Sequence, residues 1–168
     1  LAAERGRVAE EIVGAGTGAR VGKALGNKQA VKSGIGTTSQ KLGEDVIVGV
    51  LVAVNALGDV MDSETGQIIA GPRRPDGNGF LNSSEILKSG RAVRLFASTN
   101  TTIGVVATNA QLSKTQATKI AQMAHDGLAR VIRPAHTMFD GDVVFVLSLG
   151  KDERGETDVT TIGTVTAE

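Results

Sequence analysis

The chain has 168 residues, of which 40% are apolar and 21% charged, an ordinary composition for one folded domain with a sizeable core. Lys+Arg and Asp+Glu each number 18, so the formal net charge is zero, which argues against a binding surface for nucleic acid or an anionic membrane. The absence of cysteine excludes disulfides, thiol catalysis and cysteine-ligated metals.

The ends of the chain and its apolar segments indicate where the protein is located in the cell and whether the chain is part of a longer protein. No stretch is apolar for long enough to span a bilayer, and residues 1–5 lack the apolar core of a signal peptide. With cysteine absent, the compartment stays open and a cytoplasmic location fits best. Because the chain starts without Met and stops just after a strand-like stretch, we expect it to be part of a longer protein.

The first half of the chain predicts a helix end, a buried strand and glycine-rich connections. Residues 1–13 have the pattern of a helix end, and glycine-rich segments follow at 14–23 and 34–39. The nearly all-apolar run 46–55 predicts a strand buried on both faces. Residues 58–79 predict loops around a short strand at 68–70, and residues 84–94 a short helix with Ser84 as its cap.

The second half of the chain has clearer local signals. A strand is predicted at 101–108, and Ser113 and Gln116 have the spacing of a capping box that opens a helix ending by Pro134. The buried stripe of this helix is expected to be Ile120, Ala124, Leu128 and Val131. Further strands are predicted at 143–149 and 160–165, with a charged hairpin loop at 151–158. Strands and helices mix without βαβ alternation, which favours an α+β fold in layers.

The glycine-rich segment 14–23 lacks the spacing of a dinucleotide or Walker phosphate loop. Close packing, or a loop beside a substrate site, is therefore favoured over phosphate binding. Lys23, within this segment, is expected to be exposed to solvent.

The two histidines, His125 and His136, would need Asp140 or Asp142 as a third ligand to hold a metal. Without an HExxH spacing, a capping or hydrogen-bonding role is favoured over a metal site.

Two further polar positions lie at the ends of predicted strands. Asp140-Gly141-Asp142 precedes the strand 143–149; its composition favours a plain turn, and the alternative is a carboxylate pair that orients a nucleophile or accepts its protons. Asn55 ends the strand 46–55 as either a strand-end cap or an oxyanion donor.

Thr101 is either an ordinary strand-initial residue or a nucleophile that is created when the Asn100–Thr101 bond is cut. In the second case its hydroxyl attacks the preceding carbonyl and forms an ester that water opens. The freed α-amine, with an intrinsic pKa of about 8, then accepts the hydroxyl proton. Considered without other information, the residue favours the ordinary strand start.

Several segments together resemble one known family. They are 100–110 (Asn-Thr-Thr-Ile-Gly-Val-Val-Ala-Thr-Asn-Ala), 124–130, 134–137 and 140–142, with 14–19, 34–37 and 52–55 upstream. These segments are similar to peptidase family S58 (the DmpA/P1 family) of self-cleaving N-terminal-nucleophile hydrolases, which includes aminopeptidases, amidases and nylon-oligomer hydrolases.

The resemblance implies a fold and a division of the chain. The family fold is a four-layer αββα sandwich, of which this chain would form the C-terminal portion. Residues 1–100 would end the large (α) subunit, and residues 101–168 would form the small (β) subunit beginning at the nucleophile.

The resemblance also implies roles for six residues. Thr101 matches the nucleophile, and Asn100 matches the residue before the cut. Asn55 matches the group that polarises the scissile carbonyl or lines the oxyanion site. Asp140 and Asp142 match the pair that positions the nucleophile and its amine, and Lys23 matches a lysine near the site. The family site also uses a Tyr, and this chain has none, so a region outside it or a second chain would supply that part. No metal or cofactor is implied; the expected partners are a small peptide or amide substrate and further copies, as a homo-oligomer of cleaved pairs.

Two other functions stay open at this point. An acyltransferase like the ornithine acetyltransferases shares the fold and the Thr nucleophile but passes the acyl group to an amine. In a non-enzymatic assembly protein, Thr101 would be structural.

Overall fold

The structure of the protein is a computed structural model, which describes residues 6, 8–92, 100–150 and 158–168. Its elements in chain order are the 3₁₀ turn η1 (Gly14–Gly16), β1 (Arg20–Val21), β2 (Val31–Lys32), β3 (Ile35–Leu42), β4 (Val46–Ala53), β5 (Asp59–Met61), β6 (Ile68–Ala70), α1 (Ser83–Lys88), β7 (Ile103–Thr108), α2 (Lys114–Val131), β8 (Ile132–Arg133), β9 (Val143–Ser148) and α3 (Val159–Ala167).

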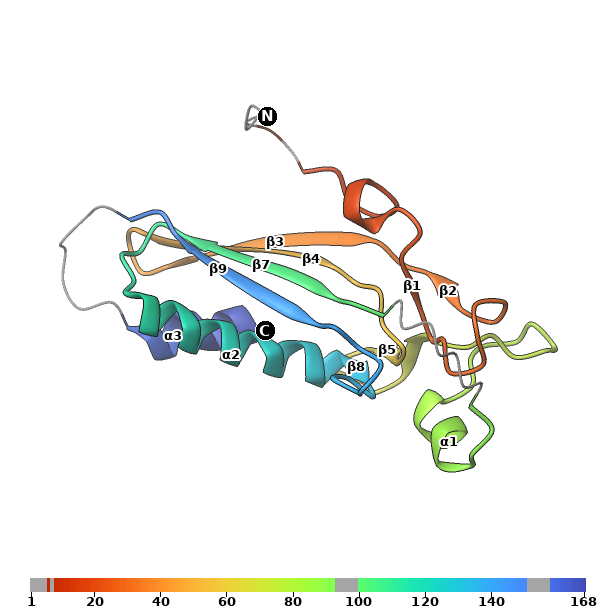
Figure 1. Cartoon of the computed structure of the whole chain (residues 1–168). Coiled ribbons are helices and arrows are strands. Elements are labelled where there is room, and N and C mark those ends of the chain that lie inside the picture. The colour runs from red at the N-terminus through yellow and green to blue at the C-terminus, as the bar shows by residue number, and fades with distance from the viewer. Residues whose placement is uncertain (1–5, 7, 93–99, 151–157) are drawn as a thin grey trace.

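The main sheet has the strand order β3-β4-β7-β9. The pairs β3–β4 and β4–β7 are antiparallel, whereas β7 and β9 are parallel. A parallel pair needs a long crossover connection, and α2 supplies most of it. The helices α2 and α3 lie side by side against one face of the sheet (Figure 1). The mixed architecture confirms the α+β class.

The core lies between the sheet and its helices. Val48 and Val106 from the sheet pack with Ile120 and Ala124 of α2 and Ile162 of α3. Burial in this layer is what holds the two long strands against the helices, because each buried aliphatic side chain contributes about 1.5–3 kcal/mol.

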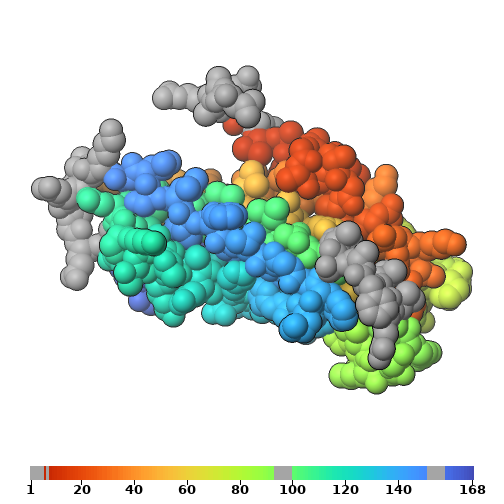
Figure 2. Space-filling view, in the orientation of Figure 1, coloured from red at the N-terminus to blue at the C-terminus, as the bar shows by residue number. Residues whose placement is uncertain are grey.

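The opposite face of the sheet carries exposed apolar side chains. In β9, Val144 and Val146 contact the core, while Phe145 and Leu147 are 54% and 49% exposed. Figure 2 shows α2 along one side of the edge strand β9 (blue) and the N-terminal segment (red) beyond its other side. The sequence of the run 46–55 predicts a strand buried on both faces, and this is wrong for the described residues: in β4 only Val48 and Ala53 are buried, and Ile47 is 50% exposed.

Several local predictions are confirmed. Ser113 and Gln116 form the capping box of α2. Of the predicted stripe, Ile120, Ala124 and Leu128 are buried, and the strand at 68–70 is present as β6. Both glycine-rich segments allow close packing: a Cβ on Gly34 would lie 2.1 Å from Glu11 O.

Other local predictions are wrong. The described part of 1–13 has no helix; instead Glu11 forms two backbone hydrogen bonds with Ile35, each of 2.8 Å. The helix α1 begins at Ser83 and is capped by Asn82 rather than Ser84, because the Asn82 side chain accepts from Glu85 N. Part of the predicted helix (93–94) and most of the predicted hairpin loop (151–157) lie outside the described residues.

The predicted strand at 160–165 is the helix α3. The Asp158 side chain accepts hydrogen bonds from the first turn, at Thr160 N and Thr161 N, and so caps the helix. Ile162 and Thr166, four residues apart, are both buried. Packing on α2 therefore overrides the strand preference of a segment rich in Thr and Val.

Candidate active site

The candidate residues meet because three strand ends coincide. Thr101 lies just before β7, Asp140 and Asp142 lie before β9, and Asn55 follows β4. Because β7 and β9 are parallel, both strands start at the same edge of the sheet. Because β4 is antiparallel to β7, it ends at that edge. The topology therefore brings all four residues to one edge.

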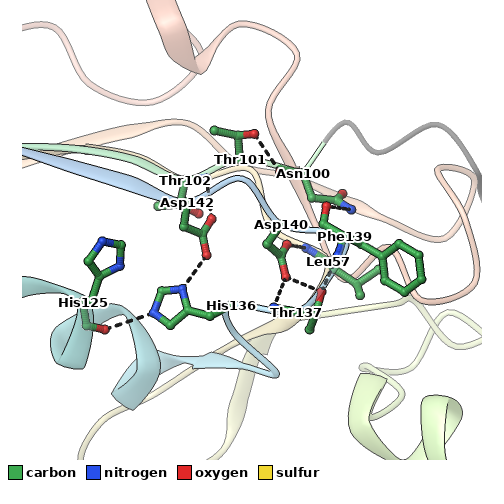
Figure 3. Close-up of polar contacts among 10 residues, drawn as sticks. All are labelled: Leu57, Asn100, Thr101, Thr102, His125, His136, Thr137, Phe139, Asp140 and Asp142. Atoms are coloured by element: carbon green, nitrogen blue, oxygen red, sulfur yellow. Dashed lines mark hydrogen bonds and ion pairs between the residues drawn. The ribbon is translucent and has the colours of Figure 1, made fainter. Parts of the chain in front are cut away.

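The peptide bond between Asn100 and Thr101 is held at both ends. Its N–H, on Thr101, donates to the main-chain oxygen of Asn55 at 2.7 Å. Its carbonyl oxygen, on Asn100, accepts from Gly141 N at 2.8 Å. The Thr101 hydroxyl donates to the same oxygen at 2.7 Å (Figure 3). The nucleophile predicted from the sequence thus lies against the bond that it would break.

Asp142 fastens the start of β7 to a neighbouring loop. Its Oδ1 accepts from Thr102 N at 2.8 Å, and its Oδ2 lies 2.9 Å from His136 Nδ1. The His136 ring also stacks edge-on against His125, with 4.9 Å between the ring centroids. In Figure 3 the Thr101 side chain points away from Asp142. The described contact of Asp142 with this segment is therefore made through the backbone of Thr102, the residue after Thr101.

Asp140 organises the loop on the other side of the bond. Its Oδ2 accepts from Thr137 N at 3.0 Å and from Thr137 Oγ1 at 2.6 Å. Its Oδ1 accepts from Leu57 N at 3.3 Å, and its backbone pairs with Asn100 in a parallel bridge. The described contacts of both carboxylates therefore brace the backbone around Thr101.

Lys23 is buried, with only 4% of its surface exposed, so the expectation of an exposed lysine is wrong. Its ammonium donates to Asn55 Oδ1, which also accepts from Arg20 N at 3.2 Å. Burial lowers the pKa of Lys23 to about 8; the carboxylate of Asp140 opposes this shift, and the charge of Arg20 adds to it.

The burial of Lys23 has a backbone cause. Gly22 N donates to Gly58 O at 2.8 Å, and Lys23 N donates to Leu57 O at 2.9 Å, so this segment is tied to the interior. Gly22 has φ +68°, and a Cβ there would lie 2.4 Å from the carbonyl carbon of Gly71. Only glycine permits this approach.

A cavity of about 340 Å³ opens beside the bond. Its lining residues are Ala15, Thr17, Gly18, Ala19, Arg20, Lys23, Asn27, Ala53, Asn55, Thr101 and Ile103. The first glycine-rich segment thus forms a loop beside the candidate site, which is one of the two roles predicted for it. Both ionisable groups in this lining are cationic.

Sequence reasoning did not place Arg20, Thr102 or Gly141 at the candidate site. The Thr102 hydroxyl is fully buried, and within the described part of the chain it has no hydrogen-bond partner. Buried polar groups without a partner are rare in folded proteins. No local pattern reveals them, because their neighbours are distant in the chain.

Two negative findings concern the described ranges only. No cluster of three His, Asp or Glu side chains there is arranged to hold a metal ion. No helix within them has the length and apolarity that a membrane span requires.

Comparison with a solved structure identifies the fold. The chain is similar to the L-aminopeptidase D-Ala-esterase/amidase of Ochrobactrum anthropi, described as a variant of the Ntn hydrolase fold, with a TM-score of 0.61 and 19% identity. The match covers 96% of this chain and 42% of that one. The protein therefore shares the fold of that structure.

Curated relatives extend the comparison. An uncharacterized aminopeptidase of Mycobacterium leprae (strain TN) is 43% identical over 89% of this chain and 40% of its own length. A 6-aminohexanoate-oligomer endohydrolase of Kocuria sp. (strain KY2) is 29% identical over 80% of this chain and 38% of its own length. The chain thus spans about two fifths of the length of these relatives. The model of peptidase family S58 matches residues 1–167, and the protein belongs to that family.

Proposed function

We propose that this chain carries the nucleophile of a peptide or amide hydrolase that activates itself by cutting the Asn100–Thr101 bond. The observation that carries the proposal is the position of the Thr101 hydroxyl, 2.7 Å from the oxygen of a carbonyl whose peptide bond is hydrogen-bonded at both ends. Membership of family S58 and the names of the relatives support the reaction class.

The first reaction is self-cleavage. Thr101 Oγ1 attacks the carbonyl carbon of Asn100 and loses its proton to a base, while the C–N bond breaks and the nitrogen takes up a proton. The resulting ester joins Asn100 to Thr101 Oγ1, and water opens it to a carboxylate and a free hydroxyl. Lys23 lines the same cavity and is our candidate base, because a pKa of about 8 leaves about a tenth of it neutral at pH 7.

The second reaction is turnover of substrate. The new α-amine of Thr101 accepts the hydroxyl proton, the oxygen attacks a substrate carbonyl, and the acyl-enzyme is hydrolysed. Asn55 O, now 2.7 Å from the Thr101 nitrogen, would hold this amine in place. The positive charges of Arg20 and Lys23, which line the same cavity, would disfavour protonation of this amine.

The substrate class follows from the relatives and the cavity. We propose short peptides or amides, with aminoacyl p-nitroanilides and 6-aminohexanoate oligomers as the probes. A cavity of about 340 Å³ is at the small end for ligand pockets, which fits a short substrate.

The test is made on the complete gene product. We expect intact-mass analysis and N-terminal sequencing to find a second chain that begins Thr-Thr-Ile-Gly. Thr101→Ala should stay uncut and inactive, and Thr101→Ser, which keeps a hydroxyl, should still be cut. An uncut protein that hydrolyses the probes would contradict the proposal. Transfer of the acyl group to glutamate rather than water would instead favour an acyltransferase.

The assembly and location of the protein remain predictions. We propose a cytoplasmic homo-oligomer of cleaved pairs; the exposed apolar face of β9 is the observation that calls for a covering layer or partner. Size-exclusion chromatography with light scattering on the complete gene product would measure the oligomer, and a monomeric mass would contradict it.

A further inference from the structure

Gly141 lies between the two aspartates, and its main-chain N–H contacts the bond that is cut. The N–H donates to Asn100 O at 2.8 Å, and the next hydrogen bond along runs from Val143 N to Thr102 O at 3.0 Å. The parallel ladder of β7 and β9 therefore extends beyond both strands. Its last hydrogen bond ends on the carbonyl that Thr101 would attack.

Space, rather than backbone conformation, explains a glycine at this position. Gly141 is not among the glycines with a left-handed φ, so other residues fit its backbone. A Cβ there would lie 3.0 Å from Thr101 Oγ1 and 3.8 Å from Asn100 O. A side chain would press on the hydroxyl oxygen in the position from which it reaches the carbonyl.

Two main-chain groups hold the reacting peptide, in addition to the Thr101 hydroxyl. Gly141 N lies at its carbonyl oxygen and Asn55 O at its nitrogen, at 2.8 and 2.7 Å. Donors fixed by a sheet need no reorganisation when charge develops on the oxygen, which is the requirement for an effective oxyanion site.

We propose that the N–H of Gly141 is the oxyanion donor for cleavage of the Asn100–Thr101 bond, and that the missing side chain leaves room for the Thr101 hydroxyl. The inference rests on the proposed self-cleavage. When Thr101 Oγ1 bonds to the Asn100 carbon, the carbonyl electron pair moves to Asn100 O, and the Gly141 N–H stabilises that negative charge. The charge returns to the carbonyl as the C–N bond breaks and the nitrogen is protonated.

A plain ladder hydrogen bond would make a different contribution. It would support the stability of the sheet edge, in the same way as the Val143–Thr102 hydrogen bond, and would leave the cleavage rate unchanged. The two hydrogen bonds therefore form a matched pair, one on the reacting carbonyl and one on its neighbour.

The experiment removes each N–H without changing a side chain. Suppressor-tRNA translation of the complete gene product would place glycolic acid at position 141, or the hydroxy-acid analogue of valine at position 143, so that an ester replaces the amide. Cleavage would be followed over time by intact mass, which separates a cut at Asn100–Thr101 from hydrolysis of the new ester. We expect the ester at 141 to slow self-cleavage about a hundredfold or more, and the ester at 143 less than about threefold.

A second pair of variants tests the space argument. Gly141→Ala should slow cleavage, and the slowing should be smaller in the Thr101→Ser background, because a Ser hydroxyl rotates more freely than that of a β-branched residue. The inference is overturned if the ester at 141 cleaves within threefold of the unmodified protein, or if both esters slow cleavage equally. Either result leaves the proposed function standing, whereas an unmodified protein that is never cut removes both.

Discussion

The two ends of β7 look alike in sequence but differ in what their polar groups do. Each end has an Asn beside a Thr, Asn100-Thr101 at the start and Thr108-Asn109 at the finish. At the finish, Thr108 Oγ1 donates to Ile47 O at 2.8 Å, and the Asn109 side chain accepts from Ile47 N and donates to Asp45 O, both at 2.7 Å. These contacts tie β7 to the start of β4.

The start of β7 adds three features that the finish does not share in the described contacts. A cavity borders Thr101, a buried lysine with a lowered pKa lines it, and the hydroxyl of Thr102 is buried without a described partner. The buried lysine and the buried hydroxyl are costs to stability, because each takes a polar group out of water. A group with a shifted pKa beside a cavity therefore distinguishes the candidate site at the start of β7 from the merely polar strand end at its finish.

The largest expected effect tests the comparison directly. Thr101→Val keeps the shape of the side chain but removes the hydroxyl, and we expect loss of self-cleavage and of hydrolysis by about a thousandfold or more. Rates would be measured by intact mass and with p-nitroanilide probes on the complete gene product. Thr108→Val is the matched control, and equal losses in both variants would break the comparison.

The next effect concerns Lys23. Lys23→Met removes the candidate base, and we expect self-cleavage at pH 7 to slow about a hundredfold. In the unchanged protein the rate should rise with pH and level off above about 8, because the neutral amine is the active form and its pKa is about 8. Lys23→Arg keeps the charge but cannot deprotonate, so it should not restore the rate. A flat pH profile for the unchanged protein would count against this role.

Lys23 also predicts how stability depends on pH. Its folded pKa of about 8 lies below the ordinary value of 10.5, so the unfolded chain binds more protons between these values. The contribution of Lys23 is therefore least favourable below pH 8, and it improves as the pH rises toward 10.5. Urea unfolding of the unchanged protein and Lys23→Met across this range would show the difference.

A smaller effect is expected at Asp142. Asp142→Asn weakens the hold on Thr102 N and His136 without touching the hydroxyl of Thr101, so we expect self-cleavage to slow about tenfold, with about 1–3 kcal/mol lost from the free energy of unfolding. His136→Gln, which disturbs one of the two contacts, should have a weaker effect. If Asp142→Asn stopped cleavage as completely as Thr101→Val, the carboxylate would have a direct chemical role.

The smallest effect lies at the finish of β7. Thr108→Val removes the hydroxyl that donates to Ile47 O and accepts from Ala110 N, and we expect a loss of about 1–2 kcal/mol in the free energy of unfolding, measured with urea, at unchanged rates. A fall in the cleavage rate of more than threefold, with the fold intact by circular dichroism, would show that this end also belongs to the site.

Much of the fold was predictable wherever one segment holds its own signal. The capping box at Ser113 and the apolar stripe through Ile120 and Leu128 predict α2, and the run of β-branched residues predicts β4. The strand prediction for 160–165 was wrong because its β-branched residues favour a strand, while the cap at Asp158 and the packing of Ile162 on α2 favour a helix. The segment is a helix because the free energy gained by burying its side chains exceeds its intrinsic preference for a strand.

The candidate site was only partly predictable. Thr101, Asn55 and the two aspartates stand at strand ends, and the family resemblance gave them roles. Lys23 was predicted to be exposed, since nothing within a few residues shows that its segment is tied to Leu57 and Gly58. Gly141 looked like a turn residue, and its contact with Asn100 O depends on the parallel pairing of two strands separated by α2.

Local signals in the sequence predict the long helix α2, the strand β7 and the residue types that stand at the start of that strand. These depend on propensity, capping and periodicity, which act over a few residues. The folded chain, and no local signal, shows that Asn55 and Gly141 contact the two ends of the Asn100–Thr101 bond and that Lys23 is buried beside it. The physical reason is that a hydrogen bond to a distant backbone and the pKa of a buried amine depend on groups that meet only after folding.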